Sequence, residues 1–217
     1  MKKFELTNEF ITNMFGTKLF RIRALVEFGD VEAGELGGYV EKESNLGHDD
    51  NAWVYDNAWV YGDAWVYGNA LVYDNARVYG NARVYGDAQV SGDALVYGNA
   101  RVYDNAWVYG NAQVSGNAQV SGDALVCGDA RVCGNGDYAY AHGFGSVNRT
   151  TTFFRLKDGG VGVRCGCFYG TLAQFRDKIR ETHGETKKAQ EYLMLADLME
   201  LRFEEDENEV GNRKYVE

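Results

Sequence analysis

Proline is absent from the 217 residues, whereas glycine occurs 27 times. Chain reversals must therefore depend on glycine and on Asn or Asp, which also tolerate positive φ angles. Long apolar runs are absent as well, and without a stretch of about 18 apolar residues we expect no membrane-spanning segment. The first residues, MKKFELTNEF, lack the apolar core of a secretory signal, so we expect a cytoplasmic protein.

Cysteine and positive charge are also scarce. The four cysteines are too few for a disulfide framework at this length, which agrees with a reducing compartment. The formal charge of −10 argues against direct nucleic-acid binding, because neutralising phosphates requires clustered Lys and Arg.

The dominant feature is a six-residue repeat. Residues 51–134 form fourteen unbroken hexads of the pattern [ND]-A-x-V-[YSC]-[GD], in which the sixth residue is Gly except at Asp56, Asp74 and Asp104. The alternation within each hexad predicts a short strand with Ala and Val inward and positions three and five outward. A helix is excluded, because a glycine at every sixth position would cost about 1 kcal/mol each.

The string V-Y-G-N-A-R-V resembles the hexapeptide repeat of left-handed parallel β-helices. That resemblance implies three hexads per coil, a triangular cross-section and an uncommon left-handed crossover. The expected fold is therefore mainly β: a left-handed parallel β-helix of nearly five coils, with an N-terminal β cap and a small C-terminal α+β (ββαα) module. Residues 136–144 continue the phase of the hexads and are expected to add two looser sides.

Three hexads per coil would stack residues eighteen apart on one wall. The first wall then carries no charge at its outward positions. Its position-three residues are Trp53, Leu71, Gln89, Trp107 and Leu125, and its position-five residues are Tyr55, Tyr73, Ser91, Tyr109 and Cys127. The second wall has Trp59, Arg77, Leu95, Gln113 and Arg131 at position three, and the third has Trp65, Arg83, Arg101 and Gln119.

All four tryptophans are predicted to point outward, and an exposed apolar strip usually marks a contact surface. We expect the first wall, with Trp53, Tyr55, Tyr73, Trp107 and Tyr109, to mediate self-association or the binding of a host protein. Two simpler interpretations stay open. The aromatic residues could serve only as a ladder that favours strands, or the C-terminal segment could fold back over one wall.

The third wall offers a second candidate site. Arg83 and Arg101 are predicted to stack next to Tyr85 and Tyr103, and an Arg–Tyr ladder could hold a nucleotide base or an anion. The alternative is a solvated face with no ligand.

The sequences on either side of the hexads are not repetitive. "LFRIRAL", "FGDVEAGELGGYVEKE" and "NL" before the repeat, and "FFRLKDGGVGVRCGCFYGTLAQFRDKIRETHG" after it, resemble the ends of phage- and prophage-encoded hexapeptide-repeat proteins. We expect residues 1–50 to form a cap and a first irregular coil, 51–147 the β-helix, 148–203 the ββαα module and 204–217 an acidic tail. In the module, residues 150–157 and 161–168 predict two strands, Thr171 an N-cap, and residues 172–183 and 187–203 two helices.

Enzymes that use a similar scaffold need histidines as catalytic residues or metal ligands, and this chain has three histidines in all. Acyltransferases of this kind work as trimers with a catalytic histidine and a projecting loop, and γ-class carbonic anhydrases share three His ligands between subunits. Here the hexads contain neither histidine nor insertion, His183 falls at a predicted helix end, and only His48 and His142 flank the repeat. We assign no catalytic residue and no cofactor, and a trimeric acyltransferase using His48 or His142 is the alternative.

The cysteines leave two interpretations. Cys165 and Cys167 lie on one face of a predicted strand, while Cys127 and Cys133 lie on successive walls of the last coil. The pairs could converge into a four-thiolate zinc site, but their spacing differs from a CxxC knuckle and free thiols are the other interpretation. No metal ligand is assigned.

The resulting hypothesis is a non-catalytic, phage-type binding or scaffold protein that acts through its outward walls and interferes with a host system. Binding of a host protein, imitation of DNA by an acidic rod and sequestration of a small nucleotide are three versions of that hypothesis. Neither the target nor the oligomeric state follows from the sequence.

Overall fold

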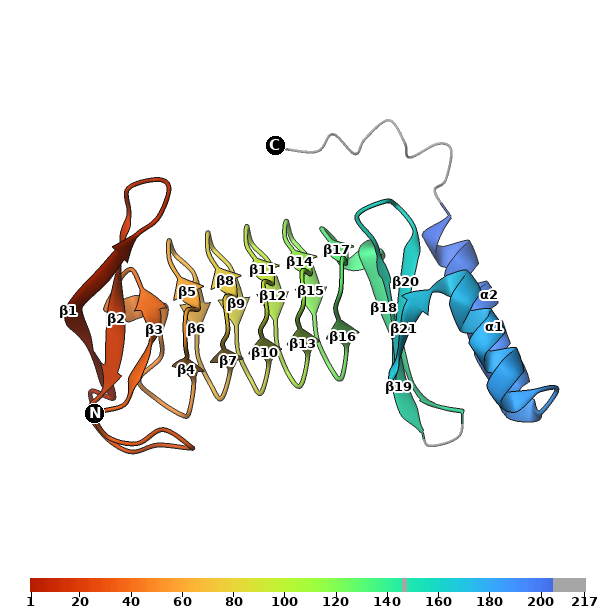
Figure 1. Cartoon of the computed structure of the whole chain (residues 1–217), viewed down its shortest axis with the longest axis horizontal. Coiled ribbons are helices and arrows are strands. Elements are labelled where there is room, and N and C mark those ends of the chain that lie inside the picture. Colours follow the sequence, from red (N-terminus) through yellow and green to blue (C-terminus); the bar gives the residue numbers. More distant parts are fainter. Residues whose placement is uncertain (146–147, 205–217) are drawn as a thin grey trace.

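Each hexad forms a two-residue strand followed by a turn in the computed structural model, which describes residues 1–145 and 148–204 (Figure 1). The fourteen strands begin at position three of successive hexads: β4 (Trp53–Val54), β5 (Trp59–Val60), β6 (Trp65–Val66), β7 (Leu71–Val72), β8 (Arg77–Val78), β9 (Arg83–Val84), β10 (Gln89–Val90), β11 (Leu95–Val96), β12 (Arg101–Val102), β13 (Trp107–Val108), β14 (Gln113–Val114), β15 (Gln119–Val120), β16 (Leu125–Val126) and β17 (Arg131–Val132).

Residues eighteen positions apart pair in parallel, as predicted. Trp53 is opposite Leu71 and Arg83 opposite Arg101, and the pattern continues along every wall. The first wall is the sheet β4-β7-β10-β13-β16, the second contains β5-β8-β11-β14-β17, and the third is β6-β9-β12-β15. Three hexads per coil and three walls are therefore confirmed, and the left-handed winding stays a prediction.

The inward residues form one continuous core. Every alanine at position two and every valine at position four of the hexads is at most 1% exposed. Because each coil repeats the same small and medium side chains, the interior is filled by a column of identical layers.

The corners explain why position six accepts only Gly or Asp. The corner glycines have φ between +60° and +71°, and Asp56, Asp74 and Asp104 have φ of 51°, 58° and 58°. Each of these aspartates accepts a hydrogen bond from a backbone N–H in the next coil, as Asp74 does from Gly92 at 2.9 Å. The carboxylate thus satisfies a turn donor and offsets part of the strain of a positive φ.

The N-terminal cap is an antiparallel sheet that runs into the second wall. It comprises β1 (Phe4–Thr12), β2 (Lys18–Ala24) and β3 (Leu36–Val40). β3 then pairs in parallel with β5, so the cap covers the first open edge of that wall. A short 3-10 helix, η1 (Glu43–Asn45), follows, and Leu46 bridges to Val66 on the third wall, completing the expected irregular coil.

The C-terminal module contains a four-stranded antiparallel sheet and two helices. Its strands are β18 (Tyr138–Phe144), β19 (Arg149–Arg155), β20 (Val161–Cys165) and β21 (Phe168–Thr171). The helices α1 (Leu172–His183) and α2 (Lys187–Phe203) match the prediction, with Thr171 capping α1 and Gly184 ending it at a φ of 58°. The acidic tail from residue 205 onward lies outside the described residues.

The expectation that residues 136–144 continue the solenoid is wrong. β18 pairs antiparallel with β19 and belongs to the module, which has four strands rather than two. The reason lies at the last hexad, where Gly134 has a φ of −155° instead of the positive φ of a corner. The Asp137 carboxylate then accepts the N–H groups of Cys133 and Gly134, and the 3-10 helix η2 (Asn135–Asp137) redirects the chain.

The module seals the end of the solenoid and does not fold back along a wall. In β19 the successive residues Phe153 and Phe154 are both fully buried, but Phe153 packs with the helices whereas Phe154 joins the solenoid core. The Leu125 N–H also donates to the Thr152 hydroxyl at 2.9 Å. Figure 1 shows the resulting rod, with the hairpin of β1 and β2 at one end and the helices at the other.

Candidate binding surface

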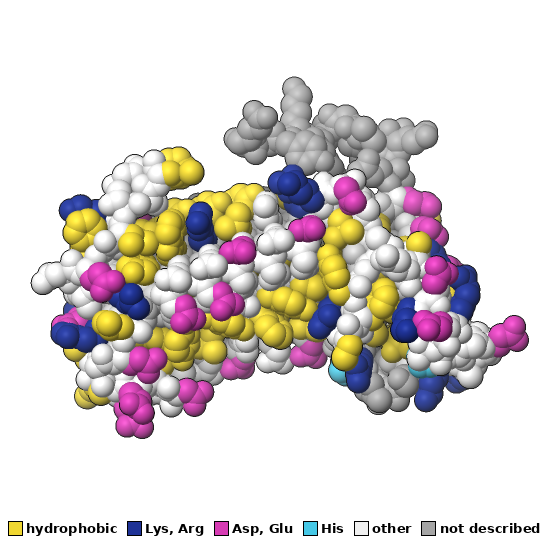
Figure 2. Space-filling model, viewed as in Figure 1, with side chains coloured by type: hydrophobic (Ala, Val, Ile, Leu, Met, Phe, Trp, Pro, Cys, Tyr) yellow, Lys and Arg dark blue, Asp and Glu magenta, His cyan; other side chains and the backbone are white. Residues whose placement is uncertain are grey.

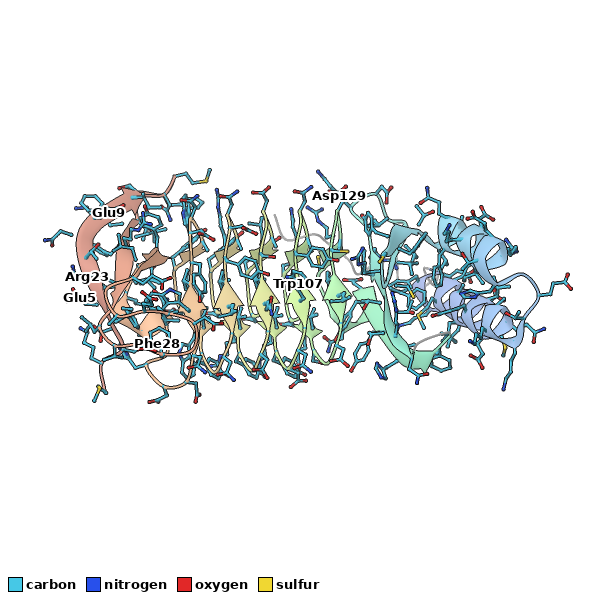
Figure 3. The ribbon with its side chains drawn as sticks, turned by 60° about the horizontal axis from the view of Figure 1, so that its bottom comes forward. Glu5, Glu9, Arg23, Phe28, Trp107 and Asp129 are labelled. Carbon is cyan, nitrogen blue, oxygen red and sulfur yellow. The ribbon has the colours of Figure 1, made fainter. Side chains whose placement is uncertain are left out.

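The middle of the first wall presents an uncharged outer strip. Trp107 on β13 is 36% exposed, its indole N–H donates to the Ser91 hydroxyl at 3.1 Å, and its ring lies 4.6 Å from that of Tyr109. The Tyr73 hydroxyl donates to Gln89 Oε1 at 3.1 Å. These contacts fix the outward side chains in place, and Figure 3 shows Trp107 on the outer face of the coils.

Trp53 is not part of that exposed strip, contrary to the prediction. It is fully buried, because Phe4 and Phe28 from the N-terminal segment pack edge-on against its indole at ring distances of 6.2 and 5.3 Å. Tyr55 next to it is half-buried against the core, and burial raises its pKa. The hexad pattern places Trp53 on the outside of its coil, but it cannot show that residues before the repeat cover it.

The other end of the strip meets the C-terminal module. The Tyr109 ring is half-buried, with the Arg164 guanidinium 6.0 Å from its centre. Burial raises the pKa of Tyr109, and a hydrogen bond with Cys127 adds to that rise. Between these two covered ends, the strip from Leu71 to Trp107 presents Trp107 as its exposed side chain, while Leu71 and Gln89 are half-buried and Ser91 is buried.

The other tryptophans have different surroundings. Trp59 is half-buried and carries the Arg77 guanidinium 4.4 Å above its ring. Trp65 on the third wall is 40% exposed and stacks on Tyr67 at 4.0 Å. Figure 2 shows hydrophobic side chains gathered in bands along the coils, with acidic side chains between the bands.

The third wall brings Arg83 and Arg101 side by side, as the register predicted. The tyrosines, however, stack on one another: the rings of Tyr67, Tyr85 and Tyr103 lie 4.9 and 5.0 Å apart and within 6° of parallel. Within the described part of the chain, neither arginine lies over a tyrosine ring or forms an ion pair. A ladder already closed by ring contacts leaves no gap between its rings for a base. The exposed position-three side chains beside it include Trp65 and the two arginines.

Burial and the neighbouring tyrosines raise the pKa of Tyr85, and the charge of Arg101 opposes that rise. The Tyr85 phenol is therefore a neutral hydrogen-bonding group at neutral pH.

The two histidines that flank the repeat lie at opposite ends of the rod. The His48 ring stacks on Phe4 at 4.6 Å, accepts the Lys3 N–H and contacts Glu43 Oε1 at 2.9 Å, which ties the cap to the first coil. His142 is exposed on β18, with Thr150 Oγ1 2.9 Å from its Nδ1.

The cysteines do not converge. Cys127 is buried beside Tyr109, whereas Cys165 accepts a hydrogen bond from the Thr151 hydroxyl within the module. Among residues 1–145 and 148–204, no group of three or more His, Cys, Asp or Glu side chains could hold a metal ion.

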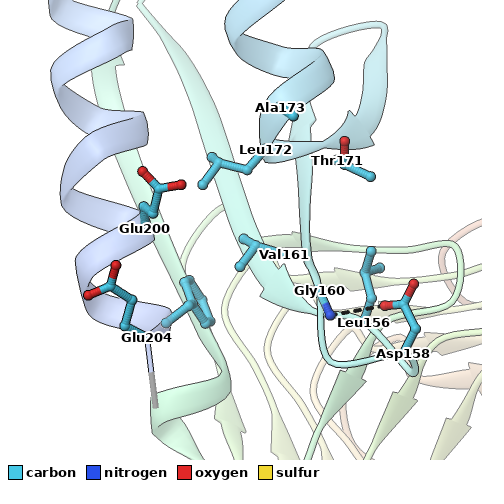
Figure 4. Close-up of a pocket in the computed structure, with 10 residues that line it drawn as sticks. Leu156, Asp158, Gly160, Val161, Thr171, Leu172, Ala173, Glu200 and Glu204 are labelled. Carbon is cyan, nitrogen blue, oxygen red and sulfur yellow. Dashed lines mark hydrogen bonds between the residues drawn. The ribbon is translucent and has the colours of Figure 1, made fainter. Parts of the chain in front are cut away.

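A hollow in the module lies away from the walls. It is formed by the turn after β19, the start of α1 and the end of α2, and Figure 4 shows Thr171, Glu200 and Glu204 at its margin. Asp158 there accepts the Gly160 N–H, and Glu200 pairs with Arg176 at 2.7 Å. Asp158 and Glu200 are thus engaged in a local turn and an ion pair.

Three parallel sheets wound from short hexads, with a cap at each end, define a β-solenoid repeat protein of about five turns. The repeats match the family model described as YdcK β-solenoid repeat. The matched residues are 52–68, 76–92, 88–100, 94–110, 100–116, 112–128 and 118–134. The match lies within the hexads and leaves both caps outside it.

No curated protein matches the chain in sequence. Within the part of the chain that the structure describes, no helix is long and apolar enough to cross a membrane.

Proposed function

We propose that this chain is a non-catalytic binding protein whose first wall is the contact surface for a partner protein. The observation that carries the proposal is the uncharged strip from Leu71 to Trp107, in which the indole of Trp107 is exposed between the covered ends of that wall. Contact surfaces between proteins are enriched in aromatic side chains and depleted of charge at their centres. In a chain with a formal charge of −10, the outward positions of this strip carry no charge.

The strip also has the rigidity that a contact surface needs. Trp107 is held by Ser91 and by Tyr109, and Tyr73 is held by Gln89. Binding therefore orders few side chains, which lowers the entropic cost of association.

The experiment compares two tryptophans at the same hexad position on different walls. Trp107→Glu places a charge in the strip, whereas Trp65→Glu places the same charge on the third wall, at a similar exposure of 40% against 36%. Both proteins should keep the far-UV spectrum and melting temperature of a folded solenoid. Only Trp107→Glu should lose a partner that wild-type protein retains from host lysate, by at least about tenfold if Trp107 is a central contact.

Equal retention by both variants would refute a contact on the first wall. A change in molecular mass with Trp107→Glu alone would instead identify the partner as a second copy of the chain.

We also propose a phage-type origin and interference with a host system, which rest on the resemblance of the two end segments. A cytoplasmic location, which we propose as well, agrees with the small number of cysteines. DNA imitation would depend on the acidic hexads, which carry eight Asp and four Arg, a surplus of four negative charges. A nucleotide bound by Arg83 and Arg101 would have to lie against the outer surface of the wall, because the tyrosine rings stack on one another and leave no space for a base between them.

The alternative function, acyl transfer by a trimer, depends on His48 or His142. A thermal-shift measurement with acetyl-CoA and with nucleotides separates these hypotheses, because a ligand that binds the native state raises its melting temperature. We expect no shift with acetyl-CoA, and a specific shift together with a trimeric mass would support the enzyme.

A further inference from the structure

The last helix, α2, has an apolar stripe that nothing in the described part of the chain covers. Met194, Leu198 and Leu201 are 71%, 54% and 67% exposed. They follow one another at intervals of four and three residues, which places them on one side of the helix. The opposite side, with Ala189, Tyr192, Ala196, Met199 and Phe203, is the buried one that packs in the module.

Two charged residues flank this stripe on the same side, near its two ends. Glu191 and Arg202 are eleven residues apart, which is about three helical turns, so they lie almost directly in line. Neither forms an ion pair with any described residue. Arg202 uses one N–H group in a long bond of 3.5 Å to the Asn135 carbonyl, and a guanidinium has five such groups.

The charges on the other flank are already engaged. Arg176 of α1 binds Asp197 at 2.8 Å and Glu200 at 2.7 Å, which draws both carboxylates away from the stripe and toward α1. The stripe therefore has one flank with complementary charges at its two ends and one flank whose charges are satisfied within the chain.

We propose that α2 pairs antiparallel with α2 of a second copy of this chain, around a two-fold axis near the middle of the stripe. Met194 of each copy then packs on Leu198 of the other, and Glu191 of each copy faces Arg202 of the other on the shared flank. A symmetric contact of this kind uses the same patch on both molecules and closes at a dimer.

A parallel pairing does not give these contacts. In it, the flank with Glu191 and Arg202 would face the opposite flank of the partner helix, where Asp197 is held by Arg176. The charge pattern therefore selects the antiparallel arrangement. Because α2 lies at the far end of the rod from the N-terminal cap (Figure 1), a dimer formed here leaves the first wall of both copies open.

The first test measures the mass of the full chain by light scattering at increasing concentration. Wild-type protein should approach twice the monomer mass by about 200 µM, where a contact with a Kd in the tens of micromolar is mostly formed. Leu198→Glu should remain a monomer with an unchanged helical spectrum. Trp107→Glu should dimerise like wild type, which separates this contact from the proposed first-wall site.

The second test exchanges the flanking charges. Glu191→Arg alone and Arg202→Glu alone should each weaken dimerisation by about tenfold, because each creates two like-charge contacts across the two-fold axis. An equimolar mixture of the two variants should regain dimers, since both cross-contacts then join opposite charges. The double variant should also dimerise.

A full chain that stays monomeric throughout this concentration range would overturn the proposal. So would a chain ending at residue 204 that dimerises when the full chain does not, because the stripe would then be occupied by residues 205–217 of the same molecule. Recovery in the double variant but not in the mixture would also overturn it, because an antiparallel pairing requires both.

Discussion

At the scale of single residues, the solenoid depends on a positive φ at every corner. Gly92 has a φ of 68°, and a Cβ built on it would lie 2.9 Å from the Gly110 nitrogen in the next coil. One coil earlier, the equivalent corner position is occupied by Asp74 with a φ of 58°, so this corner can accommodate an aspartate side chain. Gly is therefore needed mainly for its φ, and Asp replaces it where its carboxylate can accept an N–H group.

This predicts a rank order of stability for substitutions at Gly92. Gly92→Ala should lower the free energy of unfolding by about 1–2 kcal/mol, the cost of a left-handed conformation for a residue with a Cβ. Gly92→Asp should cost less, because its carboxylate can accept the Gly110 N–H. Chemical denaturation of the two variants measures the difference.

Gly134→Ala is the matched control for this series. Gly134 has a φ of −155° and open space where a Cβ would lie, so alanine should be nearly neutral there. Equal losses at Gly92 and Gly134 would contradict a role for φ at the corners.

The surroundings of Trp53 show what the repeat can and cannot predict about a single residue. The hexad pattern alone predicts that Ala and Val point inward and that Trp53 points out of its coil. It does not predict that Phe4 and Phe28 bury Trp53, because these residues belong to a non-repetitive segment whose path depends on tertiary contacts. Of the predicted binding residues on the first wall, Trp107 keeps an exposed ring, whereas Trp53 is covered completely.

At the scale of the element, the second wall carries a ladder of phenol rings. Tyr79 lies between Tyr61 and Tyr97, with ring centres 5.0 Å apart on each side. Burial, together with the charges that its two neighbours would acquire, raises the pKa of Tyr79 to about 12.

The ladder makes stability depend on alkaline pH. An unfolded tyrosine ionises near pH 10, whereas folded Tyr79 keeps its proton to about pH 12. The unfolded state therefore releases its proton first, so this contribution to stability is complete below pH 10 and is lost between about pH 10 and 12. The melting temperature should fall across that window.

Tyr79→Phe tests this assignment, because phenylalanine keeps the ring and removes the ionisable group. The variant should match wild type at pH 7 and lose less stability than wild type between pH 10 and 12. An identical alkaline loss in both proteins would show that other groups cause it.

Elements also differ in how far the sequence predicts them. The fourteen solenoid strands and both helices can be predicted from residue spacing and capping residues, because the start and end of each are determined by residues close in sequence. β18 is missed, since residues 136–144 keep the phase of the hexads while Gly134 no longer turns the corner and Asp137 redirects the chain. A backbone angle at one glycine, rather than the hydrophobic pattern, ends the solenoid.

At the scale of the whole molecule, a solenoid of identical coils needs its two ends closed, because open strand edges invite association with other chains. The N-terminal cap closes one end by continuing the second wall through β3. The C-terminal module closes the other with Phe154, which belongs to the solenoid core although its strand belongs to the module sheet.

Adjacent phenylalanines in β19 allow the sealing of the solenoid to be separated from the folding of the module. Phe154→Ala should remove the side chain that joins the last coil, at a cost of about 3–5 kcal/mol, and expose the solenoid edge. Phe153→Ala removes an equally buried ring, but from the helix side of the sheet. Because β-strand side chains alternate, the same substitution one residue apart acts on two different cores.

The two variants should therefore fail differently. Phe153→Ala should lose the helical signal at a lower temperature while the coils stay protected in amide hydrogen exchange. Phe154→Ala should keep its helices but show faster exchange at β16 and β17, together with self-association that increases with concentration. If both variants lost protection in the same coils to the same extent, the module and the solenoid would unfold as a single cooperative unit rather than as two separate units.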